Sequence, residues 1–291
     1  MTYNCKICGG ETTAAGLKRG LRTGKEFQLR RCAICGFAFV ANPWTDFARI
    51  YDAEYYQGRG SDPLVDYLFE LEHPHETIRQ HEWQGIVRVV SSLIPLTSQT
   101  RWLDFGCGNG GLVRYALETL GCEARGFEEG WIRDRAVQHG IPIFDRAALA
   151  NQEYSFDLVT AIEVIEHAID PLEIFRSVHR LLKPGGLFFF TTGNLAPFAD
   201  KLLQWRYIVP EIHVSFFEPR TLQQALERTG FRAAFPGFLP GYENIIQFKL
   251  LKNCHFRRTA GWFRFAPWRM AARYCDARLQ ITALPVGWTV G

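Results

Sequence analysis

The chain has 291 residues, of which 47% are hydrophobic and 22% are charged. These values are typical of globular proteins and exclude a disordered, fibrous or low-complexity chain. The formal net charge of +3 is too small to indicate a polyanionic partner by itself, and no apolar run reaches the roughly 18 residues of a membrane span. The first residues lack a basic region followed by an apolar one, so we expect a cytoplasmic protein.

The N-terminal segment carries four cysteines in two pairs, Cys5 with Cys8 and Cys32 with Cys35. Two C-x2-C pairs can point four thiolates at one tetrahedral ion. Disulfides are disfavoured in a reducing cytoplasm, and a redox pair would need a βαβ context that this segment lacks. Four protein ligands leave no position for water or substrate. We therefore predict that residues 1–42 form a zinc ribbon in which Zn²⁺ is structural.

The next segment, residues 43–97, is interpreted as a helical linker and lid. Apolar residues recur at roughly helical spacing from residue 63 to about residue 94, and Pro74 indicates a break between two helices.

A glycine-rich turn follows in residues 101–111, which read RWLDFGCGNGG. The pattern predicts a buried strand, the turn, and a helix over 112–120. Such a turn lets a ligand approach the backbone, but alone it serves many nucleotides. A second strand over 123–127 ends at Glu128, about 20 residues after the glycines, where a carboxylate can accept hydrogen bonds from ribose hydroxyls.

Strands and helices continue to alternate downstream. We expect strands over 141–144, 156–161 and 187–192, and a helix over 171–182. Such alternation predicts an α/β fold with a doubly wound, largely parallel sheet.

Four ordered motifs carry a resemblance over about residues 98–235: LDFGCGNGG, GFEEG, FDLVTAIEVIEH and LLKPGGLFFFTTGN. The sequence resembles the class I S-adenosylmethionine-dependent methyltransferases, which implies a Rossmann-like sheet and a SAM-binding domain over 98–240. NAD binding, the competing interpretation, would prefer G-x-G-x-x-G. The resemblance implies that the glycines line the methionine part of the cofactor and that Glu128 holds the ribose. It also implies that Asp145 lies near the adenine and that Glu163 begins a segment that closes over the cofactor. The implied cofactor-binding residues are Asp104, Gly106, Gly108, Gly110, Glu128, Asp145 and Glu163.

Residues 195–219 are aromatic and mixed in charge, as expected of a substrate lid. Methyl transfer to a hydroxyl requires removal of a proton, and His213 is the candidate catalytic base because imidazole titrates near neutrality. The alternative is a histidine that only holds the lid by hydrogen bonding. The ribbon, a Tyr-Tyr segment and the His-x-Ser-Phe-Phe element are together similar to deoxysugar nucleotide C-methyltransferases and surface-polysaccharide methyltransferases. Those deoxysugar enzymes have a tyrosine and a glutamate where this chain has Pro210 and Ile212.

The last segment, 241–291, is a basic and aromatic C-terminal extension. From Lys249 onward the sequence contains eight Lys and Arg residues and a single acidic residue, Asp276. This pattern suits a membrane interface, a nucleic acid or a nucleotide-linked substrate, and the alternative is structural cover whose arginines face water. Peripheral membrane contact through this tail is one expectation, and RNA ranks below recognition of a glycan precursor.

We expect a SAM-dependent methyltransferase of a small molecule, a sugar nucleotide or glycan precursor, with oxygen methylation favoured. The alternative is an RNA or protein methyltransferase that uses the ribbon and the tail to hold a macromolecule. DNA is not expected, because Thr192-Gly193-Asn194 replaces the Asn-Pro-Pro-aromatic motif of adenine or cytosine methylation.

Overall fold

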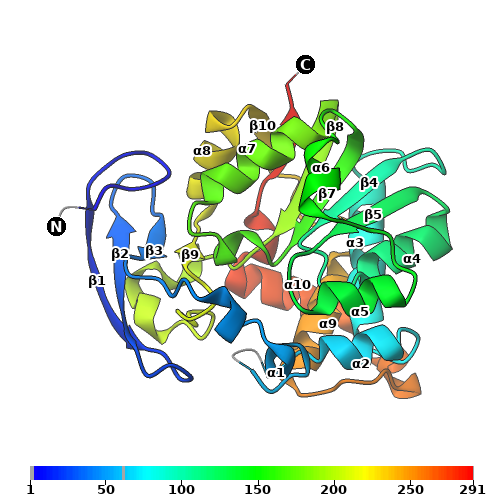
Figure 1. Cartoon of the computed structure of the whole chain (residues 1–291). Coiled ribbons are helices and arrows are strands. Elements are labelled where there is room, and N and C mark those ends of the chain that lie inside the picture. Colours follow the sequence, from blue (N-terminus) through cyan, green and yellow to red (C-terminus); the bar gives the residue numbers. More distant parts are fainter. Residues whose placement is uncertain (1–2, 61–62, 291) are drawn as a thin grey trace.

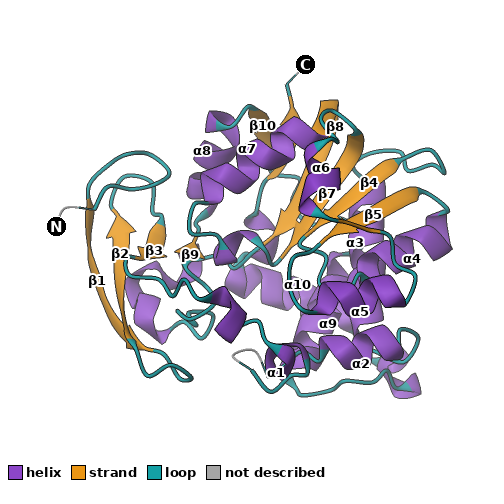
Figure 2. Cartoon of the chain, viewed as in Figure 1, coloured by secondary structure: helices purple, strands orange, loops and turns teal. Residues whose placement is uncertain are grey.

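The computed structural model describes residues 3–60 and 63–290, which form a seven-stranded sheet and a four-stranded sheet. The large sheet has helices on both faces, and the small sheet lies to one side of it, at the left of the view in Figures 1 and 2. This confirms the predicted α/β fold with a Rossmann-like sheet and an additional N-terminal module.

The strand order of the large sheet is β10-β11-β8-β7-β4-β5-β6. The chain runs outward from β4 to β5 and β6, then returns to β7 and β8 on the other side. The order therefore reverses beside β4, and ligands of doubly wound sheets bind at such a switch point, outside the carboxyl ends of the strands. The strands are β4 (Arg101–Phe105), β5 (Glu123–Phe127), β6 (Ile143–Phe144), β7 (Phe156–Ile162), β8 (Leu182–Thr191), β10 (Phe231–Ala234) and β11 (Val286–Thr289).

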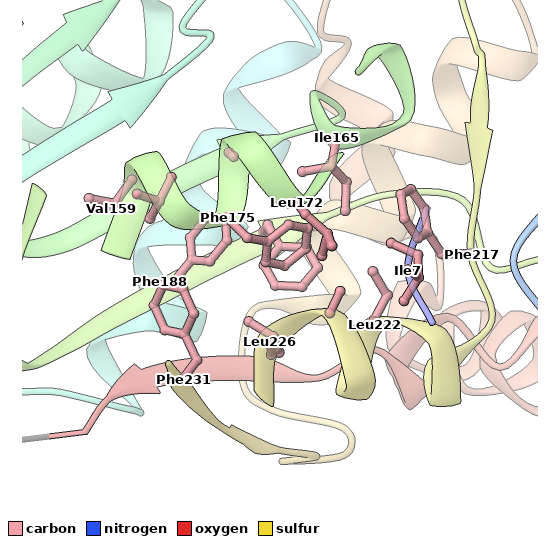
Figure 3. Packing of buried hydrophobic residues seen from close by; sticks show 14 of the residues in the cluster. Ile7, Val159, Ile165, Leu172, Phe175, Phe188, Phe217, Leu222, Leu226 and Phe231 are labelled. Carbon is pink, nitrogen blue, oxygen red and sulfur yellow. The ribbon is translucent and has the colours of Figure 1, made fainter. Parts of the chain in front are cut away.

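Successive side chains of β8 point to opposite faces of the sheet, and the apolar core is therefore divided between the two faces. Phe188 and Phe190 pack in a cluster with residues of α7 and α8, whereas Leu187 and Phe189 pack in a cluster with residues of α3, α4 and α9. Figure 3 shows the first of these clusters between β8 and the helices that cover it. The helices are α1 (Ala53–Tyr56), α2 (Tyr67–Glu72), α3 (Arg79–Ser91), α4 (Gly111–Leu120), α5 (Ile132–Gln138), α6 (Arg146–Ala150), α7 (Pro171–Leu181), α8 (Pro219–Arg228), α9 (Tyr242–Asn253) and α10 (Trp268–Leu279).

Shorter 3-10 turns connect these elements. They are η1 (Phe47–Arg49), η2 (Ile165–His167), η3 (Ala196–Gln204), η4 (Gly261–Phe265) and η5 (Ile281–Ala283). In the part of the chain that the structure describes, no helix is long and apolar enough to cross a bilayer.

The boundaries of two strands differ most from the sequence expectation: β6 begins at Ile143 and not at residue 141, and the larger difference is in β8. β8 begins at Leu182 and not at residue 187. Leu182 pairs with Phe156 and Leu187 with Leu158, so the Lys-Pro-Gly-Gly run is an irregularity inside the strand. Gly185 adopts a φ of 77° there, a conformation that glycine adopts without strain.

The C-terminal segment 241–291 supplies α9, α10 and β11. β11 lies between β8 and β10 and is antiparallel to both. The Thr289 hydroxyl donates to the Lys183 carbonyl at 2.7 Å and accepts from the Gly186 N–H at 3.0 Å. This part of the tail therefore belongs to the sheet interior.

The small sheet joins the N-terminal module to the rest of the chain. Its strands β1 (Thr12–Arg19), β2 (Glu26–Cys32) and β3 (Ala38–Val40) are antiparallel neighbours, and β3 also pairs with β9 (Ser215–Phe216) from the segment after β8. Figure 3 shows Ile7 beside Phe217 and Leu222, and Ile7 is fully buried. The module therefore shares its apolar core with the large domain.

Candidate functional site

The four predicted cysteine ligands come together. The Sγ atoms of Cys5 and Cys35 are 3.4 Å apart and those of Cys8 and Cys32 are 3.5 Å apart, and all four lie within 4.8 Å of one another. Tetrahedral thiolates at the usual Zn–S distance of about 2.3 Å are separated by roughly 3.8 Å. The cluster therefore has the dimensions of a four-thiolate metal site.

The glycine turn leaves β4 in a conformation that requires glycine. Gly106, Gly108 and Gly110 have φ values of 74°, 56° and 71°, in the left-handed region that residues with a Cβ avoid. The N–H of Gly106 donates to the Phe127 carbonyl at 2.8 Å, which fixes the turn against the end of β5. Gly110 is the N-cap of α4, so the turn presents a helix N-terminus, where anions and polar ligands are stabilised.

Glu128 lies directly beside this turn, as predicted. Its carboxylate accepts hydrogen bonds from the N–H groups of Gly108 at 2.9 Å, Glu129 at 3.0 Å and Gly130 at 2.6 Å. Burial raises the pKa of Glu128, and these backbone donors oppose the rise. The carboxylate is thus held at the carboxyl end of β5, next to the glycines.

The other two predicted carboxylates on this side occupy different positions. Asp104 is buried beneath the turn and accepts from the Thr160 hydroxyl at 2.7 Å, and burial raises its pKa to about 7. It therefore joins β4 to β7 below the surface of the site. Asp145 follows β6 and is exposed, and it accepts the Ala148 N–H at 2.7 Å as the N-cap of α6.

Two tyrosines from the 43–97 segment cover the turn. The Tyr67 ring lies 3.2 Å from where a Cβ on Gly108 would stand, and the Tyr56 hydroxyl packs directly against Gly130. Their ring centroids are 5.5 Å apart. α2 therefore packs on the glycine turn, and α1 packs on the segment after β5 that holds Glu128.

Glu163, at the end of β7, is paired with a lysine from the C-terminal segment. Its Oε1 accepts from Lys249 Nζ at 2.9 Å and from the Thr191 hydroxyl at 3.0 Å. Burial raises the pKa of Glu163, but the Lys249 ammonium, assisted by Lys252 and the Thr191 hydroxyl, outweighs burial and holds that pKa at about 2. Glu163 is therefore ionised, and α9 brings its counter-ion to the site.

A second group of polar side chains adjoins this pair. The Tyr207 hydroxyl oxygen accepts from the Gly193 N–H at 3.0 Å and lies within hydrogen-bonding distance of Glu163, at 3.1 Å, and of Glu166. Its single proton is donated to one of these carboxyl groups at a time. Burial raises the pKa of Glu166 to about 7, whereas burial lowers the pKa of His167 to about 4. His167 is therefore neutral at pH 7.

His213 joins this group through its ring. Its Nδ1 lies 2.6 Å from the Tyr207 carbonyl oxygen, and because a carbonyl only accepts, Nδ1 carries the proton and the lone pair lies on Nε2. The rings of His213 and His167 are 4.9 Å apart. Ligand atoms of Glu166, His167 and His213 also lie within 4.8 Å of one another, so these three could hold a metal ion.

The sequence places Tyr207 in the expected lid and Glu166 and His167 in the motif FDLVTAIEVIEH, but it gives neither these residues nor Lys249 a role as site residues. Glu166 and His167 follow Glu163 closely and could have been found from their position after β7. Lys249 is 86 residues from Glu163, and no local pattern links the two. A cavity of about 30 Å³, lined in part by Thr191, Thr192 and Lys249, separates this pair from the start of β11.

Comparison with known proteins gives consistent similarities. The model of a family described as "Methyltransferase domain" matches residues 75–234. The ubiquinone biosynthesis O-methyltransferase of Ruegeria pomeroyi is 43% identical over 106 residues, 33% of this chain and 42% of the relative. That of Colwellia psychrerythraea is 32% identical over 151 residues, 45% of this chain and 60% of the relative. The chain thus spans about half the length of these curated relatives.

Solved structures are also similar at lower identity. Phosphoethanolamine N-methyltransferase 2 of Haemonchus contortus has a TM-score of 0.49 and 16% identity, covering 100% of this chain and 72% of that one. An S-adenosylmethionine-dependent methyltransferase of Mesorhizobium loti has a TM-score of 0.46 and 20% identity, covering 70% of this chain and 96% of that one.

Proposed function

The chain belongs to the methyltransferase-domain family, and we propose that it transfers a methyl group from S-adenosylmethionine to a hydroxyl of a small-molecule acceptor. The observation that carries the proposal is the arrangement at the carboxyl edge of the sheet. The glycine turn with Glu128 lies at the ends of β4 and β5, and the network of Glu163, Glu166 and Tyr207 adjoins the ends of β7 and β8.

The residues present fit the cofactor. The glycines leave the backbone open to the methionine part, and Glu128 holds a carboxylate where ribose hydroxyls can donate to it. Asp145 lies further out along the same edge, directly after β6, and is assigned to the adenine in this proposal. When bound, the cofactor supplies a methyl group already activated on a sulfonium, so the protein's task is to align the acceptor and remove a proton.

His213 is the base in this proposal. The Tyr207 carbonyl fixes the tautomer that places the lone pair on Nε2, and the Tyr207 ring stacks on the imidazole with centroids 4.3 Å apart. Tyr207 is in turn held by Glu163 and Glu166. The carboxylates thus orient the histidine through the tyrosine.

For the methyl acceptor, we propose a chemical class and not an individual compound. Oxygen methylation is supported by the names of the similar O-methyltransferases and is consistent with the proposed role of His213. A sugar nucleotide or glycan precursor is the first acceptor class to test, because the ribbon and lid elements are similar to those of sugar-modifying enzymes, and a quinone-type phenol is the second.

The cysteine cluster is proposed to bind a structural zinc ion. Its four thiolates fill a tetrahedral coordination sphere. The Thr221 hydroxyl donates to the Cys35 carbonyl at 2.6 Å, so the same cluster also anchors α8. Zinc would therefore stabilise the junction between the ribbon and the large domain.

The test is transfer of labelled methyl from S-adenosylmethionine into a cell extract divided into small molecules, lipid-linked glycans, RNA and protein. Label in the small-molecule or glycan fraction is expected, and label confined to RNA or protein would overturn the acceptor class. On the acceptor so found, His213→Ala should reduce kcat by roughly 10²- to 10⁴-fold without changing affinity for S-adenosylhomocysteine. His75→Ala, at an exposed histidine, is the matched control. Full turnover of His213→Ala would remove the base assignment.

A further inference from the structure

Residues 262–278, here named the arginine-aromatic segment, place large apolar side chains in solvent. Trp262, Phe265, Met270 and Tyr274 are exposed by 57%, 75%, 74% and 63%. Single exposed apolar residues are common, but several in one short stretch mark an interaction surface. The segment comprises most of η4 and α10, and neither element contributes to the site described above.

The inner side of α10 is well anchored. Ala272 is fully buried, and the Trp268 indole donates to the Phe263 carbonyl at 2.6 Å. Asp276 accepts from the N–H and hydroxyl of Thr282 at 2.8 Å and 2.9 Å. These contacts fix α10 to η4 and η5, and among the described residues none covers its outer side so as to bury Met270 or Tyr274.

The outer side of α10 has a definite pattern. At 100° per residue, Met270 and Tyr274 lie together on the side opposite Ala272, and Arg269 and Arg273 flank them on one side while Arg278 flanks them on the other. An apolar strip between rows of arginine is the pattern of helices that lie in the plane of a membrane interface.

The arginines of the segment keep their charge uncompensated, and one of them, Arg273, also stacks on the Phe238 ring with its Cζ 4.0 Å from the centroid. Within the described residues, no acidic side chain forms an ion pair with Arg264, Arg269, Arg273 or Arg278. In contrast, Arg257 pairs with Asp66 at 2.9 Å. The sole acid of the segment, Asp276, is turned inward to Thr282, so the outer side carries positive charge alone.

We propose that the arginine-aromatic segment binds the surface of an anionic lipid bilayer. The arginines meet the lipid phosphates, and Trp262, Phe265 and Met270 enter the boundary between headgroups and acyl chains. Met270 favours a bilayer over RNA, because a flexible thioether gives a base no flat surface on which to stack. α10 packs against α9, which carries Lys249 to the site, so the membrane would lie one helix away from the reacting edge.

The experiment is co-sedimentation of the full chain with vesicles of phosphatidylcholine alone or with 30 mol% phosphatidylglycerol (about one lipid in three, enough for a negative surface potential). We expect binding to the anionic vesicles that weakens with salt. Each basic residue near an anionic surface contributes about fivefold to partitioning, so Arg269→Glu/Arg273→Glu should reduce binding by about 25-fold or more. Trp262→Ser/Phe265→Ser should also reduce it.

Matched controls are available on other surfaces. Arg176→Glu/Arg180→Glu reverses two exposed arginines at the same spacing on α7, and Leu21→Ser replaces an apolar side chain that is 97% exposed. Both should bind vesicles like the original chain, and circular dichroism should show all variants folded.

Three results would overturn the proposal. One is equal loss of binding in the α7 control, which would indicate a general charge effect. Another is a concentration-dependent dimer, seen by light scattering, that Trp262→Ser/Phe265→Ser abolishes, since the segment would then bind a second copy. The third is absence of vesicle binding together with RNA binding that needs the same arginines.

Discussion

The Lys249–Glu163 pair gives the sharpest test of the site, through Lys249→Met. This substitution keeps most of the side chain's volume but removes the ammonium, which leaves the Glu163 carboxylate without its counter-ion. Against the effect of burial, Lys249, with smaller contributions from Lys252 and Thr191, holds the pKa of Glu163 at about 2 in place of 4.5. At about 1.4 kcal/mol for each tenfold change in acidity, these interactions are together worth about 3 kcal/mol net of burial. The side chains of Glu163 and Lys249 are 29% and 31% exposed. Solvent screening should therefore reduce the interaction free energy to about 1–2 kcal/mol.

The assay is urea unfolding, followed by tryptophan fluorescence, of the original chain, Lys249→Met, Glu163→Gln and the double variant. The double-mutant cycle isolates the pair, and we expect a coupling free energy of about 1–2 kcal/mol at pH 7. Because the folded-state pKa of Glu163 is depressed, this stabilisation is present above the unfolded pKa near 4.5 and is lost as the pH falls toward 2. The coupling should therefore shrink in acid.

Lys252→Met is the matched control on the same helix. Lys252 allows the same chemical change, and its ammonium forms no ion pair among the described residues; it lowers the pKa of Glu163 only through a weaker Coulomb attraction than that of Lys249. We expect it to cost less than about 0.5 kcal/mol. A coupling below that value in the Lys249 cycle, or an equal cost in the control, would refute the reasoning.

Three further predictions concern the rest of the molecule. Metal analysis should find one zinc ion per chain. Cys32→Ser should lose the ion and lower Tm by about 10 °C or more, whereas Cys254→Ser, at an exposed cysteine, should keep both the ion and the Tm. Full stability without metal would contradict the ribbon assignment. Burial raises the pKa of Asp104 from 3.8 to about 7, so folding takes up a proton at pH values between these two. The free energy of unfolding should therefore fall by on the order of 1–2 kcal/mol as the pH rises from 5 to 7. A pH profile of unfolding that Asp104→Asn leaves unchanged would contradict this. Glu128→Ala should weaken binding of S-adenosylhomocysteine about tenfold or more by removing the carboxylate's hydrogen bonds, while Glu129→Ala, at the neighbouring residue, should not. Calorimetric titration measures both affinities, and an unchanged affinity of Glu128→Ala would contradict the ribose assignment.

The sequence by itself determined the features that depend on local chemistry. Alternating strands and helices predicted the parallel sheet because hydrophobic periodicity and chain connectivity act over short distances. The spacing of Cys5, Cys8, Cys32 and Cys35 predicted their cluster. The glycines at 106, 108 and 110 were recognisable from their spacing between a strand and a helix, and the structure gives all three a left-handed backbone. Glu128 follows from its position after the next strand.

Asp104 and Asp145 show where local patterns stop being sufficient. Both stand at or near strand ends, yet one is buried against Thr160 and the other is an exposed helix cap. A strand pattern gives the edge of the sheet at which a residue lies, but the depth of its side chain depends on the neighbouring strand and the helix above it. Their place in cofactor binding remains a prediction.

Only the tertiary structure decided which distant segments meet. β11 enters the sheet between β8 and β10, β9 joins the ribbon to the lid, and Lys249 reaches Glu163 across 86 residues. None of these contacts has a local signature, because two residues far apart in the chain are brought together by the packing of the helices and strands that carry them. The site is therefore specified locally at the glycine turn and globally around Glu163 and His213.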